Sequence, residues 1–122
     1  MDTESPITQE RSDVQPTTDH TDLTTFQTNL LAAIAGHERG YYESDTYGLS
    51  IKRALEDLYG GEINNGRLYP NLNSLVDQGL VEKEPIDDRT NGYALTDAGQ
   101  HILRERTQLL LASLGRDAEV VR

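Results

Sequence analysis

The order of helical and extended patterns along the chain is the feature that most constrains its fold. Between residues 24 and 114 the sequence shows three short helical patterns, then two extended segments, then one longer helical pattern. A glycine follows each of the three short patterns, at Gly36, Gly60 and Gly79, and glycine is the residue that most often ends a helix. The order predicts a mostly α-helical chain with one small β-hairpin.

Two helices are predicted before residue 61. Thr24-Thr25-Phe26-Gln27 has the form of a capping box, so we predict a first helix from there to Gly36. A second helix is predicted from Asp45 or Thr46 to Tyr59. Its inner face is expected to carry four residues at helical spacing, Tyr47, Ile51, Leu55 and Leu58.

A third helix, a hairpin and a last helix are predicted from residue 65 onward. The third helix is expected over residues 65–78, because Leu68, Leu72 and Leu75 form one apolar stripe. Residues 80–84 and 92–95 have the pattern of two short strands on either side of a polar turn. Thr96 is expected to cap a last helix over residues 97–114.

Three helices followed by a hairpin form the outline of a winged helix-turn-helix, here with an added C-terminal dimerisation helix. In such a domain the third helix enters the major groove of DNA and the hairpin, or wing, touches the backbone beside it. We therefore divide the chain into an acidic flexible N-terminal arm (1–22), a winged-helix DNA-binding domain (23–95) and a C-terminal dimerisation helix and tail (96–122).

The net charge of the chain argues against DNA binding at ordinary salt. There are 21 acidic residues and only 11 basic ones, which gives −10 at pH 7. Just two of the basic residues, Lys52 and Lys83, are lysines. A protein of this charge repels a polyanion unless salt screens the charges, and at about 1 M salt the screening length is only ~3 Å. We interpret the composition as that of a halophilic protein, with an ordinary acidic protein as the alternative.

The sequence offers little for chemistry or for a membrane. It has no cysteine, and its three histidines are scattered, so we expect no disulfide, no metal site and no cofactor. No nucleophile or phosphate-binding loop is evident, so we expect no enzymatic activity. The sequence contains neither a long apolar run nor a hydrophobic leader, which favours a cytoplasmic protein.

The residues of the predicted elements resemble the successive signatures of PadR-like transcriptional regulators. The most specific is Gly66-Arg67-Leu68-Tyr69-Pro70, and Tyr47-Gly48-Leu49-Ser50-Ile51 precedes it at the expected spacing. The resemblance covers residues 23–110, and the acidic, cysteine-free composition is similar to that of haloarchaeal members. It implies winged-helix DNA binding and dimerisation. Arg67 stands where the family often has a small Thr or Ser, so the resemblance does not indicate which DNA sequence is bound.

Nine residues are candidates for contacts with DNA. Arg67 begins the third helix and is expected to pair with a guanine edge or a phosphate. Lys52 on the second helix, and Lys83 and Arg89 on the wing, are expected to contact phosphates, with nearby acids as alternative partners. The remaining candidates lie on the third helix and are Asn65, Gly66, Tyr69, Asn73 and Ser74. Helix capping is the alternative role for Asn65, and a packing role is the alternative for Tyr69.

The last helix is apolar over more than one face, with three consecutive leucines at 109–111. One apolar stripe is enough to pack against a single domain. We therefore expect a second copy of the chain as the partner, with a fully buried terminal helix as the alternative. The expected interface residues are Phe26, Leu30, Ile102, Leu103, Leu109, Leu110 and Leu114.

Together these features predict a sequence-specific, dimeric DNA-binding transcription regulator that works at high salt, with salt ions at its interface with double-stranded DNA. The resemblance adds repression and a response to stress. The alternative is a winged-helix module that binds proteins in a transcription complex, which the acid excess favours and the basic wing disfavours. An architectural binder without sequence preference is a third possibility.

Overall fold

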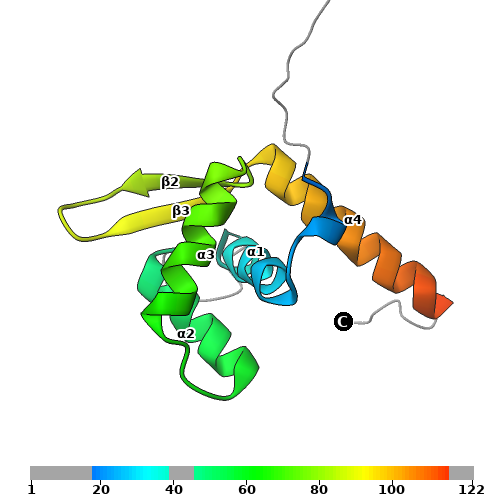
Figure 1. Cartoon of the computed structure of the whole chain (residues 1–122), viewed down its shortest axis with the longest axis horizontal. Coiled ribbons are helices and arrows are strands. Elements are labelled where there is room, and N and C mark those ends of the chain that lie inside the picture. The colour runs from blue at the N-terminus through cyan, green and yellow to red at the C-terminus, as the bar shows by residue number, and fades with distance from the viewer. Residues whose placement is uncertain (1–17, 39–45, 116–122) are drawn as a thin grey trace, which may run out of the picture.

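The computed structural model describes residues 18–38 and 46–115 of the chain (Figure 1). Four α-helices and one antiparallel hairpin follow each other in the predicted order, which confirms the winged-helix fold class. The elements are η1 (His20–Asp22), α1 (Thr25–Glu38), α2 (Gly48–Tyr59), α3 (Asn65–Asp77), β2 (Val81–Pro85), β3 (Asn91–Leu95) and α4 (Asp97–Leu114). Most of the predicted N-terminal arm, residues 1–17, lies outside the described residues.

The two ends of α1 differ in how well the sequence predicts them. The capping box is confirmed, because the Thr24 amide donates to Gln27 Oε1 and the Gln27 amide donates to Thr24 Oγ1, each at 3.1 Å. The predicted end at Gly36 is wrong, since α1 continues to Glu38. Gly36 is not among the described glycines with a positive φ, and His37 is buried in the last turn with its Nδ1 2.9 Å from the Ala33 carbonyl oxygen.

α2 begins later than predicted because the residues before it pair with the wing. The Tyr93 amide donates to the Thr46 carbonyl at 2.9 Å, and Tyr47 forms an isolated antiparallel bridge with Gly92. Thr46 therefore cannot start the helix, and the other predicted start, Asp45, lies outside the described residues. Leu58 was expected on the inner face of α2 but is 64% exposed, because the last turn of α2 projects beyond α1 (Figure 1).

The core lies around α1, which packs against α2, α3, β3 and α4. Ten large side chains are almost completely buried: Leu30, Leu31, Ile34, Ile51, Leu55, Leu68, Leu72, Leu75, Leu80 and Val81. Burying one such side chain stabilises a fold by about 1.5–3 kcal/mol. Because every helix of the helix-turn-helix contributes to this core, the core determines how α3 is held.

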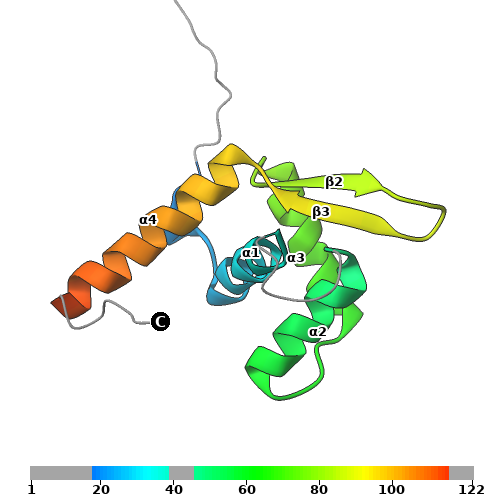
Figure 2. The same ribbon diagram turned by 180° about the vertical axis from the view of Figure 1, so that it is seen from behind.

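The hairpin and α4 leave the core in different directions (Figure 2). β2 and β3 pair antiparallel, with Val81 opposite Leu95 and Pro85 opposite Asn91. α3 ends as predicted, because Gly79 follows it with φ 78°. The predicted cap of α4 is also confirmed, since Thr96 Oγ1 accepts from the Gly99 amide at 3.0 Å.

Residues 18–22, the end of the predicted arm, differ from the flexible segment that was expected. They form the short helix η1, where Asp19 accepts from the Thr21 amide at 2.9 Å and Asp22 accepts from the Asp19 amide at 2.8 Å. η1 lies beside α4 (Figures 1 and 2), and Thr18 Oγ1 donates to Gln78 Oε1 at 2.9 Å. Reciprocal capping and contact with α4 hold this part of the chain.

Candidate nucleic-acid interface

The outer face of α3 is the first part of the candidate interface. Leu68, Leu72 and Leu75 are completely buried, and residues on the opposite side of the helix, such as Gly66 and Asn73, are exposed. Asn64, and not Asn65, caps the helix, since its side chain accepts from the Arg67 amide at 2.9 Å. The capping role considered for Asn65 is therefore wrong, and Asn65 lies exposed in the first turn.

Arg67 is exposed in the first turn of α3, off the buried leucine stripe as expected, and its side chain lies against rings of two other helices. Its guanidinium carbon is 4.0 Å from the ring centroid of Phe26 in α1 and 5.7 Å from that of Tyr59 at the end of α2. The Arg67 side chain therefore covers the junction of three helices, whereas Gly66 and Asn73 occupy the outer face.

Strand alternation separates the basic and acidic residues of the wing. Lys83 lies on the side of β2 that faces α3, and its Nζ is 3.5 Å from Asn73 Oδ1. Glu82 and Glu84 alternate with it and line a cavity of about 210 Å³ together with Thr46. The sequence suggested that these acids flank the basic wing residues closely, but the pleat directs them to the other face of the hairpin.

A second cavity, of about 380 Å³, lies between the start of α2, the middle of α3 and the wing. Its lining residues are Tyr47, Gly48, Leu49, Tyr69, Arg89, Thr90, Asn91 and Tyr93. Tyr69 lies closely against α2, because a Cβ at position 48 would be 2.7 Å from its hydroxyl oxygen. Glycine at 48 thus allows the tyrosine hydroxyl to reach this cavity, which gives Tyr69 a packing role and also a polar group at the candidate interface.

Tyr93 closes the inner end of this cavity. Its side chain is buried, and burial raises the pKa of the phenol above its ordinary value, with a smaller contribution from the neighbouring Tyr69. A hydrogen bond with the Asn91 side chain acts in the opposite direction on this pKa. Tyr93 therefore stays neutral over the physiological range and acts as part of the hairpin's packing.

The wing loop is held by Asp87. Its Oδ1 accepts from the amides of Arg89 and Thr90, both at 2.9 Å, and the Ile86 amide donates to the Thr90 carbonyl at 2.8 Å. The hydrogen bond from the Arg89 amide is the main reason why the pKa of Asp87 is lowered. An ordered loop fixes the place of Arg89 at the edge of the cavity.

Two further predicted residues lie at the margins of this group. Lys52 is half-buried on α2 and follows the cavity-lining Gly48 and Leu49 at helical spacing. Ser74 Oγ accepts from Gln78 Nε2 at 3.0 Å, and Gln78 in turn binds Thr18, so Ser74 lies on the flank of α3 that faces the N-terminal segment. The structure therefore brings together Asn65, Gly66, Tyr69, Asn73, Lys83 and Arg89, with Lys52 and Ser74 at the margins, and the Arg67 side chain lies against α1 and α2.

Sequence reasoning missed the residues whose role depends on another element. Leu49, Thr90 and Asn91 line the larger cavity, and Phe26 and Tyr59 lie against Arg67. The only local signal was that Leu49 follows Gly48 within a family signature. None of these contacts has a fixed spacing in the sequence.

The residues expected at a dimer interface fall into two groups. Phe26, Leu30 and Ile102 are 5%, 0% and 5% exposed, so they belong to the core of the single chain and have almost no surface to give to a partner. Leu103 is partly buried against the same core. The other three expected interface residues lie in the exposed second half of α4: Leu109 (45% exposed), Leu110 (55%) and Leu114 (70%).

The described residues offer neither a membrane-spanning helix nor a metal-binding cluster. No helix within 18–38 and 46–115 is long and apolar enough to cross a membrane. The same residues contain no group of three or more His, Cys, Asp or Glu side chains placed to hold a metal ion.

The fold defines a winged-helix protein. The chain belongs to the PadR-like family of transcriptional regulators, whose family model matches residues 41–105, and the predicted resemblance is thereby confirmed. Its family is therefore one of transcription regulators.

Solved structures of known proteins support this assignment. The structure of RosR from Halobacterium salinarum is 47% identical in sequence, covers 82% of this chain and 84% of its own, and has a TM-score of 0.72. The complex structure of hsRosR-S1, also 47% identical, covers 79% of this chain and 80% of its own at a TM-score of 0.69.

More distant structures share the fold alone. The MepR–DNA complex of S. aureus is 19% identical, covers 80% of this chain and 69% of its own, and has a TM-score of 0.56. A comparison with curated proteins finds no match.

Proposed function

We propose that the chain binds double-stranded DNA with the outer face of α3 and with the wing. The observation that carries this proposal is the contact of Lys83 with Asn73, because it makes the exposed side of α3 and the basic side of the hairpin one continuous surface. Asn73 and Asn65 offer amide groups suited to base edges, and Lys83 and Arg89 offer cations suited to phosphates. Tyr69 offers a hydroxyl, Gly66 permits a close approach of the backbone, and Lys52 and Ser74 contact the DNA at the margins.

A second copy of the chain completes the functional unit in this proposal. In the first half of α4, Ile102 and Leu103 pack on the core, and Leu109, Leu110 and Leu114 continue the same side of the helix. Those three leucines are exposed because α4 runs past the rest of the domain (Figure 1). Pairing of two such helices buries them and presents two α3 helices to successive half-sites of DNA.

We further propose that the protein acts at high salt as a stress-responsive repressor. The net charge of −10 repels DNA in dilute salt, and Glu82 and Glu84 add negative charge on the opposite face of the same hairpin. Concentrated salt screens these acids, and cations between carboxylates and phosphates turn some repulsion into bridging contacts. Repression is the mode of regulation that the resemblance to this family implies.

The test is a binding titration with duplexes selected from a random library in 2 M KCl. We expect one sequence class to be enriched, and the double variant Lys83→Gln/Arg89→Gln to bind all duplexes more weakly by roughly fivefold, which corresponds to about 1 kcal/mol. Arg104→Gln is a control with a charge change of the same sign at an exposed arginine on α4, away from the wing, and should bind like the unmodified protein.

A protein-binding winged helix is the second candidate. Leu49 is 54% exposed and lines the larger cavity, and Ile86 is 50% exposed and lies beside Gly92 on the wing, so both offer apolar surface to a protein partner. If no duplex binds at any KCl concentration, and Leu49→Ser weakens capture of a transcription-complex protein, this second function replaces the first.

A further inference from the structure

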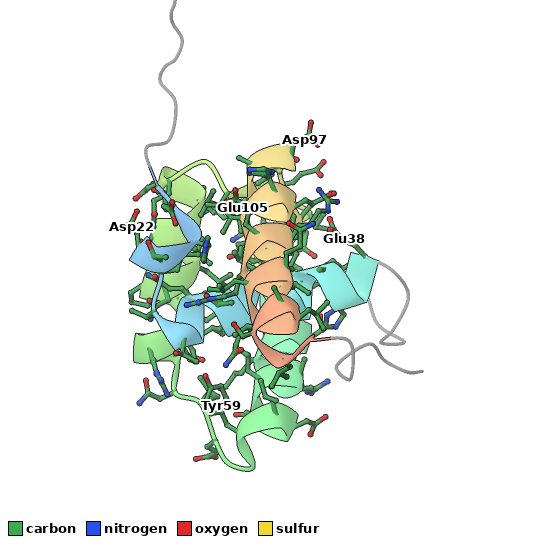
Figure 3. All side chains as sticks on the ribbon, turned by 90° about the vertical axis from the view of Figure 1, so that its right-hand side faces the viewer. Asp22, Glu38, Tyr59, Asp97 and Glu105 are labelled. Carbon is green, nitrogen blue, oxygen red and sulfur yellow. The ribbon has the colours of Figure 1, made fainter. Side chains whose placement is uncertain are left out.

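Three helices of the winged-helix domain meet at one aromatic cluster, which contains Phe26 of α1, Tyr59 of α2 and Arg67 of α3. The guanidinium of Arg67 lies over the Phe26 ring at 4.0 Å and near the Tyr59 ring at 5.7 Å. The two rings are themselves 6.0 Å apart, and Asn29 Nδ2 donates to the Tyr59 hydroxyl at 2.8 Å. Figure 3 labels Tyr59, which lies at the end of α2 close to the α2–α3 turn.

A second set of contacts fixes the same turn of α3. Asn71 Nδ2 donates to the Arg67 carbonyl at 2.7 Å, and Asn71 Oδ1 accepts from Gln27 Nε2 of α1 at 3.2 Å. The start of α3 is thus tied to α1 both by the Arg67 side chain and by the backbone of the same residue.

The direction of Arg67 separates it from the outer face of α3. Successive residues of an α-helix are rotated by about 100°, so Arg67 projects toward α1 while Gly66 and Pro70 project outward. A planar guanidinium over an aromatic face gains electrostatic attraction, and it shields the ring from water. If Arg67 turned outward to a base, it would give up this contact and uncover the Phe26 ring.

We propose that Arg67 is a positioning residue, which holds the start of α3 against α1 and α2 and thereby sets how the outer face of α3 meets DNA, without reading a base itself. This inference rests on the proposed DNA-binding function. It assigns base recognition to the outward residue Asn73, together with Asn65, which is exposed because it begins the helix.

Base preference distinguishes positioning from reading. We would select duplexes from a random library in 2 M KCl with the unmodified protein, Arg67→Lys, Arg67→Gln and, as the reading control, Asn73→Ala. We expect both Arg67 variants to lose about tenfold in affinity for all duplexes and to keep the base preferences of the unmodified protein. Asn73→Ala should instead change the preference at one or two positions.

Each other result has a definite meaning. A loss of preference at a single base pair in the Arg67 variants, with normal binding elsewhere, would overturn the positioning role. If the unmodified protein enriches no duplex at all, the proposed function itself fails.

Two further measurements test whether Arg67 acts through Phe26. In a double-mutant cycle, the tenfold effect of Arg67→Gln should largely disappear in a Phe26→Leu background, because the ring contact is already lost. A base-reading arginine would show the same loss in both backgrounds.

Because Phe26 is buried, Phe26→Leu could fail to fold. The unmodified protein therefore supplies the second measurement: the NMR signal of the Arg67 side-chain Nε–H should be shifted by the ring and should stay shifted when DNA is added. Loss of that shift on DNA binding would overturn the proposal.

Discussion

At two glycines, the absence of a side chain lets separate elements come into contact. A Cβ on Gly99 would overlap the carbonyl oxygen of Leu80, at the point where α4 crosses the start of β2. That same carbonyl accepts a hydrogen bond from the Thr96 amide at 3.1 Å. Gly48 plays the corresponding part beside Tyr69. The direction of α4 therefore depends on the absence of a Cβ at Gly99.

Gly99→Ala should lower the free energy of unfolding by roughly 3 kcal/mol, because a backbone carbonyl cannot move aside as a flexible side chain would. Denaturation followed by circular dichroism measures this loss. Gly61→Ala is the matched control, since no atom lies within 4 Å of its Cβ position, and it should change stability by less than about 0.5 kcal/mol. Equal stability of the two variants would show that α4 can shift freely on β2.

Among the elements, the wing depends most on a single side chain. The loop between β2 and β3 is closed by Asp87, whose carboxylate accepts two backbone amides. The strands place Lys83 toward α3 and the loop places Arg89 beside the larger cavity. Order in this loop is therefore needed to hold one of the two wing cations in place.

Asp87→Ala should increase hydrogen exchange at the Arg89 and Thr90 amides at least about tenfold, because both lose their acceptor. Asp88→Ala is the matched control, since the neighbouring acid takes no part in these two hydrogen bonds. In the unmodified protein the pKa of Asp87 is lowered on folding. The stabilisation that ionised Asp87 gives to the folded state is therefore fully present above the unfolded-state pKa of about 3.9. It is lost as the pH falls through the lower pKa of the folded state. Protection of the two amides that does not weaken at all as the pH is lowered below about 3.9 would contradict this.

For the whole molecule, the surfaces that remain after folding determine which partners can bind. The second half of α4 carries exposed leucines on the side that packs against the core in its first half. The acid excess is distributed over a chain that has only 11 basic residues. The exposed leucines of α4 favour pairing with a second copy of the chain. The acid excess makes contact with DNA depend on salt.

Leu109→Glu together with Leu110→Glu should convert the dimer into monomers, because unpaired charges in an apolar helix contact are costly. Light scattering in 2 M KCl measures the mass. Gln108→Glu with Ala112→Glu places two charges on the opposite side of α4 and should leave the dimer intact. A dimer that survives the leucine substitutions would mean that the interface lies elsewhere.

DNA affinity should change little with salt, or even rise, between about 0.2 and 3 M KCl. Ordinary DNA-binding proteins release counterions and lose affinity steeply over this range. Here screening of the acids and uptake of cations oppose that loss. Glu82→Gln with Glu84→Gln should make DNA affinity fall more steeply as KCl rises. An operator titration over this KCl range measures the slope for the variant and for the unmodified protein. A steep loss by about 1.5 M in the unmodified protein would rule out a high-salt function.

Local patterns in the sequence determined most of the elements. The capping box at Thr24, the cap at Thr96 and the glycine at 79 were confirmed because their signals need only neighbouring residues. The order of elements and the family followed from periodicity and from motifs such as Gly66 to Pro70.

Only the tertiary structure decided what each surface residue faces. Arg67 was expected outward, but the Phe26 ring that holds it belongs to another helix, 41 positions earlier in the chain. Leu58 lies on a stripe typical of burial, yet α2 runs past the core and leaves it exposed. Periodicity gives the direction of a side chain relative to its own helix, and the packing of other elements determines whether anything lies in that direction. The fold could therefore be predicted from the sequence, whereas the candidate interface also required the packing of the elements.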